Sequence, residues 1–102
     1  MEGSSAGGRG AMVHLDYISE MLGSEANQNV SVVGLLDSPY WIDIPPFPNP
    51  KNTFVGFENT TKGVYHQANV THLDSGCAAQ YTGEERWKCL FGQYRIPFLK
   101  TP

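Results

Sequence analysis

Apolar side chains recur every three or four positions between Ala11 and Leu22, as they do on one face of an amphipathic helix. Gly23 follows the last of them, at the position where a glycine commonly caps a helix. The pattern predicts a helix from about Ala6 to Leu22, entered directly from a glycine-rich turn at residues 3–10. The apolar stripe consists of Ala11, Met12, Leu15, Ile18, Met21 and Leu22.

Residues 30–36, with the sequence VSVVGLL, are β-branched and almost continuously apolar. They predict a short strand buried on both faces, as in a parallel sheet, preceded by a polar connection at residues 24–29. The stretch 37–58 that follows contains five prolines, which exclude a helix or a central strand. Apolar side chains among these prolines favour an ordered loop that packs against the protein. Loops of this length are usually functional or disordered.

The C-terminal half shows weaker patterns. Residues 59–68 predict a weak helix interrupted by Gly63, residues 77–91 predict one or two short helices, and the tail QYRIPFLKTP is expected to be extended. The fold class is therefore α/β with one convincing strand. One strand cannot form a parallel sheet, so we expect residues 1–102 to be the middle of a larger domain. The strand before Gly3 and the elements after Pro102 would be missing.

Charge and composition exclude several classes of function. The chain has 102 residues, with 7 Lys and Arg against 10 Asp and Glu and a formal net charge of −3. Its cations are scattered, so neither nucleic acid nor a membrane surface is an expected partner, because phosphate groups are bound by clustered cations. No apolar run approaches the ~20 residues that span a bilayer. The N-terminus lacks the basic and apolar regions of a signal peptide.

Gly3-Ser4-Ser5-Ala6-Gly7 matches the pattern G-x-S-x-G and is followed by the predicted helix. In this pattern the serine is a nucleophile on a sharp strand-to-helix turn, for which the glycines leave room. Ser5 would be the nucleophile, and the backbone amide of Ala6 would be one donor of the oxyanion hole. A glycine-rich capping loop without chemistry explains the spacing equally well. The motif for a phosphate-binding loop is absent.

A serine nucleophile needs a base and an orienting carboxylate. His66 and His72 are the candidate bases, whereas His14 shares the helix that follows the turn and is expected to face away. Asp37, Asp43 and Asp74 are the available carboxylates, and Ser5, Asp37 and His72 can be assembled into a triad on paper. Each histidine can equally be a surface residue. The spacing predicts no metal site, and no cofactor is expected.

Cys77 and Cys89 are separated by eleven residues, and three N-x-[ST] sequons occur at Asn29, Asn59 and Asn69. Together they favour the secretory pathway and a short disulfide loop. Two reduced buried cysteines are the alternative. The aromatic residues Tyr40, Trp41, Phe47, Phe54 and Phe57 either line a pocket mouth beside the serine or anchor the long loop.

Taken together, these blocks resemble the pectin acetylesterase/Notum family of carboxylesterases. Residues 3–8 look like its nucleophile elbow, and residues 34–38 with 40–43 are similar to its strand-Asp-Ser-aromatic-Asp segment. Cys77 with residues 84–92 resembles its Trp-x-Cys-Phe-Phe region, and Thr101-Pro102 resembles the entry to the next strand. The blocks occur in the family's order along nearly the whole chain. Pro39 stands where members usually have glycine, and residues 45–50 match no motif.

The resemblance implies a secreted, partial α/β-hydrolase-like fold that cleaves an ester through an acyl-enzyme. Ser5 inherits the nucleophile role and Ala6 one oxyanion amide, while Asp37, Ser38, Tyr40 and Trp41 would lie at the pocket. The triad Asp and His of the family lie on segments that would follow Pro102, so Asp37 and His72 are not promoted to the triad. The isolated chain is expected to be inactive.

The resemblance also implies that Cys77 pairs with Cys89, and that the substrate is an acylated polysaccharide or an acylated protein. The alternative function is a non-catalytic secreted glycoprotein module that keeps the scaffold and binds carbohydrate or a protein partner.

Overall fold

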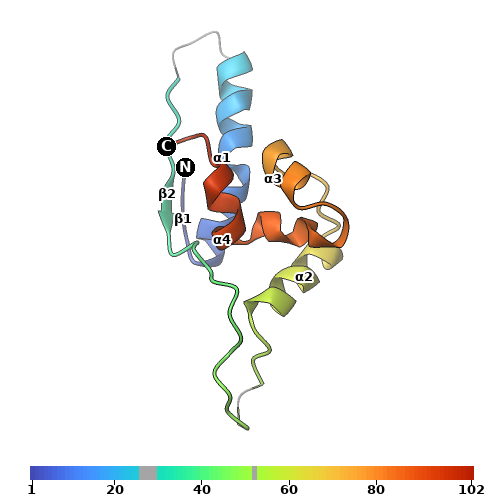
Figure 1. Cartoon of the computed structure of the whole chain (residues 1–102). Coiled ribbons are helices and arrows are strands. Elements are labelled where there is room, and N and C mark those ends of the chain that lie inside the picture. The colour runs from blue at the N-terminus through green and yellow to red at the C-terminus, as the bar shows by residue number, and fades with distance from the viewer. Residues whose placement is uncertain (26–29, 52) are drawn as a thin grey trace.

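Two short parallel strands joined by a long helix form the N-terminal part of the protein, which is a computed structural model describing residues 1–25, 30–51 and 53–102. Strand β1 (Glu2–Ser4) leads into helix α1 (Ala6–Glu25), and β2 (Leu35–Asp37) returns beside β1. The register pairs Glu2 with Leu35 and Ser4 with Asp37. The sheet lies along one side of α1, and the two termini lie close together beside it (Figure 1). This arrangement confirms the predicted α/β class.

The strand predictions are corrected in two respects. The strand expected to be missing before Gly3 is present in short form as β1, which overlaps the predicted glycine-rich turn. Of the predicted strand at residues 30–36, only Leu35 and Leu36 lie in β2. Val33 and Leu35 are 60% and 68% exposed, so burial on both faces was a wrong prediction. Helix α1 covers one face of the sheet, and no element of the described ranges covers the other.

Helix α1 begins at Ala6 as predicted but continues past Gly23 to Glu25. The cap prediction at Gly23 was therefore wrong, and residues 26–29 of the predicted connection lie outside the described residues. Helix α2 (Phe57–Gln67) also begins earlier than predicted and runs through Gly63 without interruption. A single glycine costs a helix only about 1 kcal/mol, which is too little to break one that packs on a neighbour.

Four short helical elements follow α2: α3 (Ser75–Gln80), the 3₁₀ helix η1 (Gly83–Leu90), α4 (Gly92–Arg95) and the 3₁₀ helix η2 (Ile96–Phe98). The first two confirm the short helices predicted at residues 77–91. The predicted extended tail was wrong, because Gly92–Phe98 is helical. Tyr94 in this segment contacts the rings of both Trp87 and Phe91. The sequence of the tail alone does not reveal this packing.

The core lies between α1, η1 and α4. It contains Met12, Leu15, Trp87 and Phe91, each at most 2% exposed. The predicted disulfide is present, joining Cys77 of α3 to Cys89 of η1, and both cysteines are buried.

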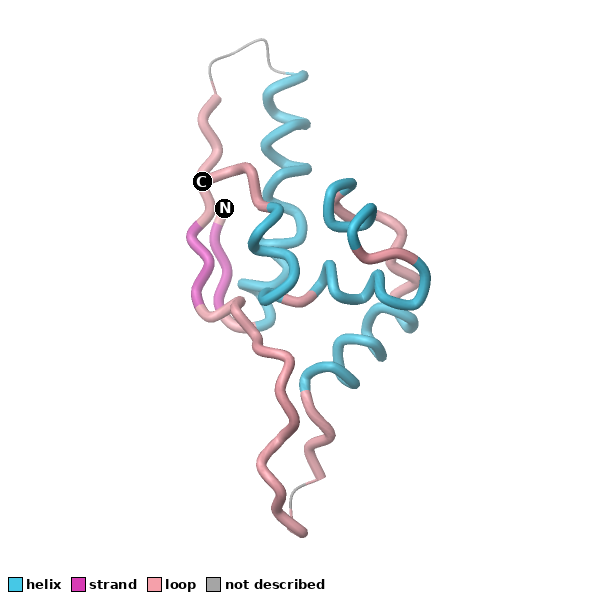
Figure 2. The backbone as a smooth tube through the Cα atoms, viewed as in Figure 1, coloured by secondary structure: helices cyan, strands magenta, loops and turns pink. Residues whose placement is uncertain are grey.

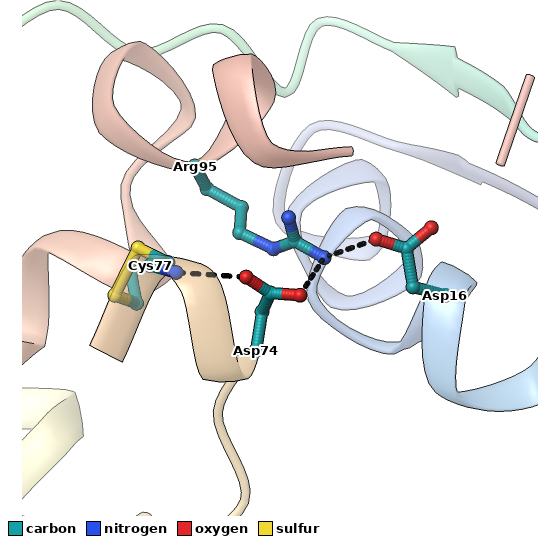
Figure 3. Close-up of a disulfide and its surroundings, with 5 residues drawn as sticks. Asp16, Asp74, Cys77 and Arg95 are labelled. Carbon is teal, nitrogen blue, oxygen red and sulfur yellow. Dashed lines mark hydrogen bonds and ion pairs between the residues drawn. A yellow bond between two sulfur atoms is a disulfide. The ribbon is translucent and has the colours of Figure 1, made fainter. Parts of the chain in front are cut away.

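A buried ionic network crosses this core (Figure 3). Arg95 Nη2 lies 2.9 Å from Asp16 Oδ2 and 3.9 Å from Asp74 Oδ2. Asp16 also accepts hydrogen bonds from the backbone N–H groups of Thr101 at 2.8 Å and of Lys100. Burial alone would raise the pKa of Asp16, but these hydrogen bonds outweigh it and lower that pKa below its usual value. Asp74 caps α3 by accepting a hydrogen bond from the Cys77 N–H.

The proline-rich loop between β2 and α2 projects away from the rest of the molecule (Figure 2). With this loop included, the molecule measures 57 × 28 × 22 Å. Its base is fixed to α4: Gln93 N–H donates to the Trp41 carbonyl, and Tyr94 Oη donates to Asp43 Oδ2 at 2.5 Å. Towards its tip, the Phe47 side chain is 84% exposed. The predicted packing of this loop is therefore confirmed at the base and wrong at the tip.

Candidate active site

Ser5 stands at the sharp turn between β1 and α1. Its φ angle is +51°, in the left-handed region that costs a non-glycine residue about 1–3 kcal/mol and that is often found at active sites. Two backbone hydrogen bonds hold this conformation: Ser5 N–H donates to the Asp37 carbonyl at 2.9 Å, and Arg9 N–H donates to the Ser5 carbonyl at 3.1 Å. Ser5 is exposed at the surface, so the turn presents the side chain rather than burying it.

The turn depends on two glycines. A Cβ on Gly3 would lie 2.2 Å from the carbonyl oxygen of Gly7, and a Cβ on Gly8 would lie 2.6 Å from the carbonyl oxygen of Asp37. A Cβ on Gly7 would meet no atom of the described residues within 4 Å. A side chain would therefore clash at Gly3 and at Gly8, whereas Gly7 has room for one. The motif G-x-S-x-G does not include Gly8, which entered the sequence analysis only through the resemblance of residues 3–8 to the family's nucleophile elbow.

Asp37 ties the ends of the two strands together beside the turn. Its carboxylate accepts a hydrogen bond from the Ser4 hydroxyl at 2.8 Å and another from the Ser38 hydroxyl at 2.9 Å. These bonds, that of Ser4 first, lower the pKa of Asp37 below its usual value. Ser38 also has a left-handed φ of +57°. Among the described residues, the Asp37 carboxylate accepts hydrogen bonds from the two serines and none from a histidine, so the triad of Ser5, Asp37 and His72 does not form.

The three histidines do not act on Ser5 in this structure. His72 stacks on Tyr17 of α1 with ring centroids 5.9 Å apart, and Tyr17 lies roughly 18 Å along the helix from Ser5 at 1.5 Å per residue. His66 contacts Tyr65. His14 lines the same cleft as Ala6, contrary to the expectation that it faces away. No hydrogen bond joins any of them to Ser5 in the described ranges.

A cleft of about 410 Å³ opens beside the turn and is mostly apolar. Its walls come from α1, α2, the end of η1 and the base of the projecting loop. Of the aromatic residues considered for a pocket mouth, Trp41 lines this cleft. Phe57 packs on Trp41 at 4.2 Å and Phe54 packs on Phe57 at 5.0 Å, so these two anchor the loop. Lining side chains include Ala6, Arg9, Val13, Trp41, Val64 and Leu90.

Tyr40 and Phe47 do not line the cleft and are exposed. The possible pocket set of the sequence analysis therefore divides in two. Trp41 lies in the cleft, while Asp37 and Ser38 belong to the turn and Tyr40 lies outside both.

Arg9 is a residue of this cleft that sequence reasoning missed. Its guanidinium lies 4.2 Å from the centre of the Trp41 ring, and its Nη1 donates to Thr61 Oγ1 at 3.5 Å. It thereby links α1, the loop and α2 across the cleft. Burial lowers the pKa of Arg9 below its usual value. Its position four residues after Ser5 was the available signal, because residues four apart on a helix lie one above the other.

Two of the three sequons can be placed. Asn59 and Asn69 are both exposed, as an attached glycan requires. Asn59 Nδ2 donates to the Val55 carbonyl at 3.0 Å. Asn29 lies outside the described residues.

The part of the chain that the structure describes contains no group of three or more His, Cys, Asp and Glu arranged to hold a metal ion. In the same residues, no helix combines the length and the apolar character needed to cross a bilayer.

Comparison with known proteins gives one consistent result. The family described as Pectinacetylesterase matches residues 1–102. Palmitoleoyl-protein carboxylesterase notum1a of Danio rerio is 31% identical over 106 residues, covering 100% of this chain and 21% of the relative. The NOTUM protein of the same description from Drosophila melanogaster is 33% identical over 100 residues, covering 98% of this chain and 14% of the relative.

Among solved structures, the Wnt deacylase Notum from Drosophila superposes with a TM-score of 0.83 at 32% identity. The match covers 99% of this chain and 28% of that chain. This chain thus spans 21% and 14% of the length of these two curated relatives. These findings confirm the resemblance used in the sequence analysis and the partial α/β-hydrolase-like fold.

Proposed function

This chain belongs to the pectinacetylesterase family, and from this premise we propose that it carries the nucleophile of a carboxylesterase. Ser5 Oγ attacks the carbonyl carbon of an ester, the alcohol leaves, and water then releases the acyl group from the serine. The observation that supports this proposal is the left-handed turn at Ser5. It is kept against its conformational cost, at the start of a long helix and beside an apolar cleft.

The start of α1 fits the charge that develops during such a reaction. The backbone N–H of Ala6 lies in the first turn of the helix, where N–H groups have no acceptor within the helix. Together with the positive end of the helix dipole, it would stabilise the oxyanion of the tetrahedral intermediate. Ala6 also lines the cleft, so the acyl group of a bound ester would lie along the apolar wall of α1 with its carbonyl near this amide.

The remaining triad members are proposed to come from parts of the relatives' length that this chain does not span. The relatives extend to about five times the aligned segment, since 21% of the Danio rerio protein is matched. We therefore propose that residues 1–102 form a central part of one hydrolase domain. Ser5 has no hydrogen bond to a histidine among the described residues, and an alcohol without a base is a poor nucleophile. The isolated chain is expected to be inactive.

Two substrate classes follow from the relatives: acylated proteins, from the name palmitoleoyl-protein carboxylesterase, and acylated polysaccharides, from the family description. Secretion is proposed on the strength of the disulfide and of the exposed sequons at Asn59 and Asn69, because disulfides persist in oxidising compartments.

The test is hydrolysis of a short acyl ester by the full-length protein that carries this segment. Ser5→Ala should reduce kcat by about 10⁴-fold or more, as loss of a serine nucleophile does in other hydrolases. The neighbouring Ser4→Ala is the matched control. The Ser4 hydroxyl donates to Asp37 and has no part in the proposed chemistry, so that variant should keep most of its activity. Full activity in Ser5→Ala would disprove the assignment and leave a non-catalytic secreted binding module as the better description.

A further inference from the structure

The projecting loop exposes apolar side chains on both of its legs and at its tip (residues 44–50). Ile44, on the leg that leaves β2, is 64% exposed, and Val55, on the leg that enters α2, is 65% exposed. Phe47 lies between them in the sequence and is the most exposed of the three. The tip contains no charged residue. A projecting apolar surface of this kind is unfavourable in water unless a partner covers it.

The backbone of the tip is suited to an apolar medium. A backbone N–H without a hydrogen-bond acceptor is costly to remove from water. Four of the residues 44–51 are prolines, which have no N–H. Two more N–H groups are bonded within the loop: that of Ile44 donates to the Ile42 carbonyl at 3.0 Å, and that of Lys51 donates to Asn49 Oδ1 at 2.9 Å. At most two N–H groups of this stretch are therefore left to be satisfied on transfer from water.

The shape of the loop favours a lipid surface over a protein groove. The loop is a narrow projection that extends away from the sheet and from both chain termini (Figure 1). A groove that binds a proline-rich strand contacts a single extended segment, whereas the apolar side chains here lie on both legs of the loop. Lipid surrounds an inserted loop on all sides and would cover both legs. The hydrogen bonds of Trp41 and Asp43 to α4 hold the base of the loop, which limits the conformational entropy lost on insertion.

We propose that the tip inserts into the interfacial region of a phospholipid bilayer and holds the protein at a membrane surface. Insertion of this kind depends on apolar area, so it does not require the clustered cations that bind phosphate groups. The formal net charge of −3 provides no overall attraction to anionic lipids, and a zwitterionic bilayer is therefore the expected partner. Few side chains enter the lipid, so binding should be reversible.

Membrane binding of this kind goes beyond the esterase function and does not depend on it. Trp41 belongs both to the projecting loop and to the cleft beside Ser5. It precedes Phe47 by six positions, a separation that an extended chain spans in roughly 20 Å. With the tip inserted, the mouth of the cleft would lie close to the lipid surface.

The first test is sedimentation of the full-length protein that carries this segment with phosphatidylcholine vesicles. The wild type should sediment with the vesicles. The double variant Ile44→Ser, Phe47→Ser should lower the partition coefficient about tenfold or more, because it withdraws two large side chains from the apolar phase. Tyr17→Ser, which removes an exposed ring on α1, is the matched control and should sediment as the wild type does. The urea midpoint of each variant reports whether it is folded.

The second test places a fluorescent reporter at the tip. In Phe47→Trp, phosphatidylcholine vesicles should shift the added tryptophan emission to shorter wavelength, and brominated lipids should quench it, both relative to the wild type. These changes report transfer of residue 47 itself into lipid, which sedimentation alone does not.

The outcomes distinguish insertion from other uses of the tip. No binding to vesicles, or equal binding by the wild type and the double variant, would overturn the proposal and show that the tip is covered by another part of the full-length protein or by a protein partner. A dimer seen by analytical ultracentrifugation and lost in the double variant, without vesicle binding, would assign the tip to a contact between two copies and would also overturn it. Binding to phosphatidylserine vesicles alone, abolished by salt, would indicate electrostatic attraction and contradict insertion. Ser5→Ala should bind vesicles as the wild type does, so loss of the esterase assignment would leave this result intact.

Discussion

Four aromatic side chains occur in residues 38–56 and four in residues 77–95, but the two segments differ in how far these side chains are buried. In the C-terminal segment Trp87 and Phe91 are 2% and 0% exposed, whereas Phe47 of the loop is 84% exposed. Aromatic content is therefore a poor guide to burial in this protein. The two sets are Tyr40, Trp41, Phe47 and Phe54 in the loop and Tyr81, Trp87, Phe91 and Tyr94 in the C-terminal segment.

The difference follows from the connections between segments. Residues 77–95 are held by a disulfide and by a buried ion pair to α1, formed by side chains far apart in sequence. The loop contains prolines at five positions, which cannot donate backbone hydrogen bonds. Its described attachments lie near its base, at Trp41 and Asp43. Links between distant segments therefore determine which aromatic residues are buried.

Removal of the buried ion pair between Arg95 and Asp16 should have the largest effect on the packed C-terminal segment. Arg95→Met leaves Asp16 as a buried carboxylate without its cation, and breaking a buried pair in this way typically costs about 3–5 kcal/mol. Such a loss would unfold a marginally stable chain. Urea denaturation followed by circular dichroism measures it. The exposed Arg86→Met is the matched control and should change little; an equal effect of both variants would contradict the role given to Arg95.

The disulfide is expected to contribute slightly less. Cys77 and Cys89 are 12 positions apart, and closing a loop of that size stabilises a protein by about 3 kcal/mol in the chain-entropy picture. The double variant Cys77→Ser, Cys89→Ser should lower the free energy of unfolding by that amount and speed proteolysis of residues 77–95. Adding reductant to the wild type should have the same effect, and adding it to the double variant should have none.

Acid should weaken the packed segment before it affects the loop. The pKa of Asp16 is lowered in the folded protein, so the stabilisation from Asp16 is present above its ordinary pKa of about 3.9. It is lost as the pH falls through the lower, folded value, because the unfolded state then binds more protons. We expect the free energy of unfolding to fall with pH in this range. Asp16→Asn should flatten that part of the profile; an unchanged slope would argue against the network.

Sequence reasoning succeeded where the signal was local. The start of α1 at Ala6, the turn at Ser5 and the short helices around Cys77 and Glu84 all follow from spacing or from turn residues. The stripe of α1 also identified Met12 and Leu15 as core residues. The pairing of Cys77 with Cys89 came from the family resemblance, and the structure confirms it.

The rest could not be predicted, because it depends on contacts between distant segments. Arg95 pairs with Asp16, which lies 79 positions away in the sequence, and no local pattern predicts this pairing. Gly8 matters because a Cβ added there would lie 2.6 Å from the carbonyl oxygen of Asp37, a neighbour from the other strand. Arg9 joins the cleft through Trp41 and Thr61, which lie on separate elements. The helical tail at Gly92–Phe98 likewise depends on Trp87 and Phe91 being in place.

Tyr94 links the two regions, so its hydroxyl offers a milder test. Tyr94→Phe removes the hydrogen bond to Asp43 and should cost about 0.5–1.5 kcal/mol. The loss should be local: amide hydrogen exchange should quicken near Asp43 and Trp41 and stay unchanged in η1. Tyr40→Phe, on an exposed ring, is the control. If exchange in η1 quickened as much as in the loop, Tyr94 would be a core residue rather than a link.

The smallest effect is expected at the loop tip. Phe47→Ser replaces a side chain that is 84% exposed, and surface substitutions of this kind usually change stability by less than about 0.5 kcal/mol. The urea midpoint should stay where it is, while Phe91→Ser, on a fully buried ring, should cost about 3 kcal/mol or more. If Phe47→Ser were as damaging as Phe91→Ser, the ring would be buried in solution, and the contrast between the two regions would not hold. The opposite result would show that a phenyl ring contributes to stability here only where distant segments are joined around it.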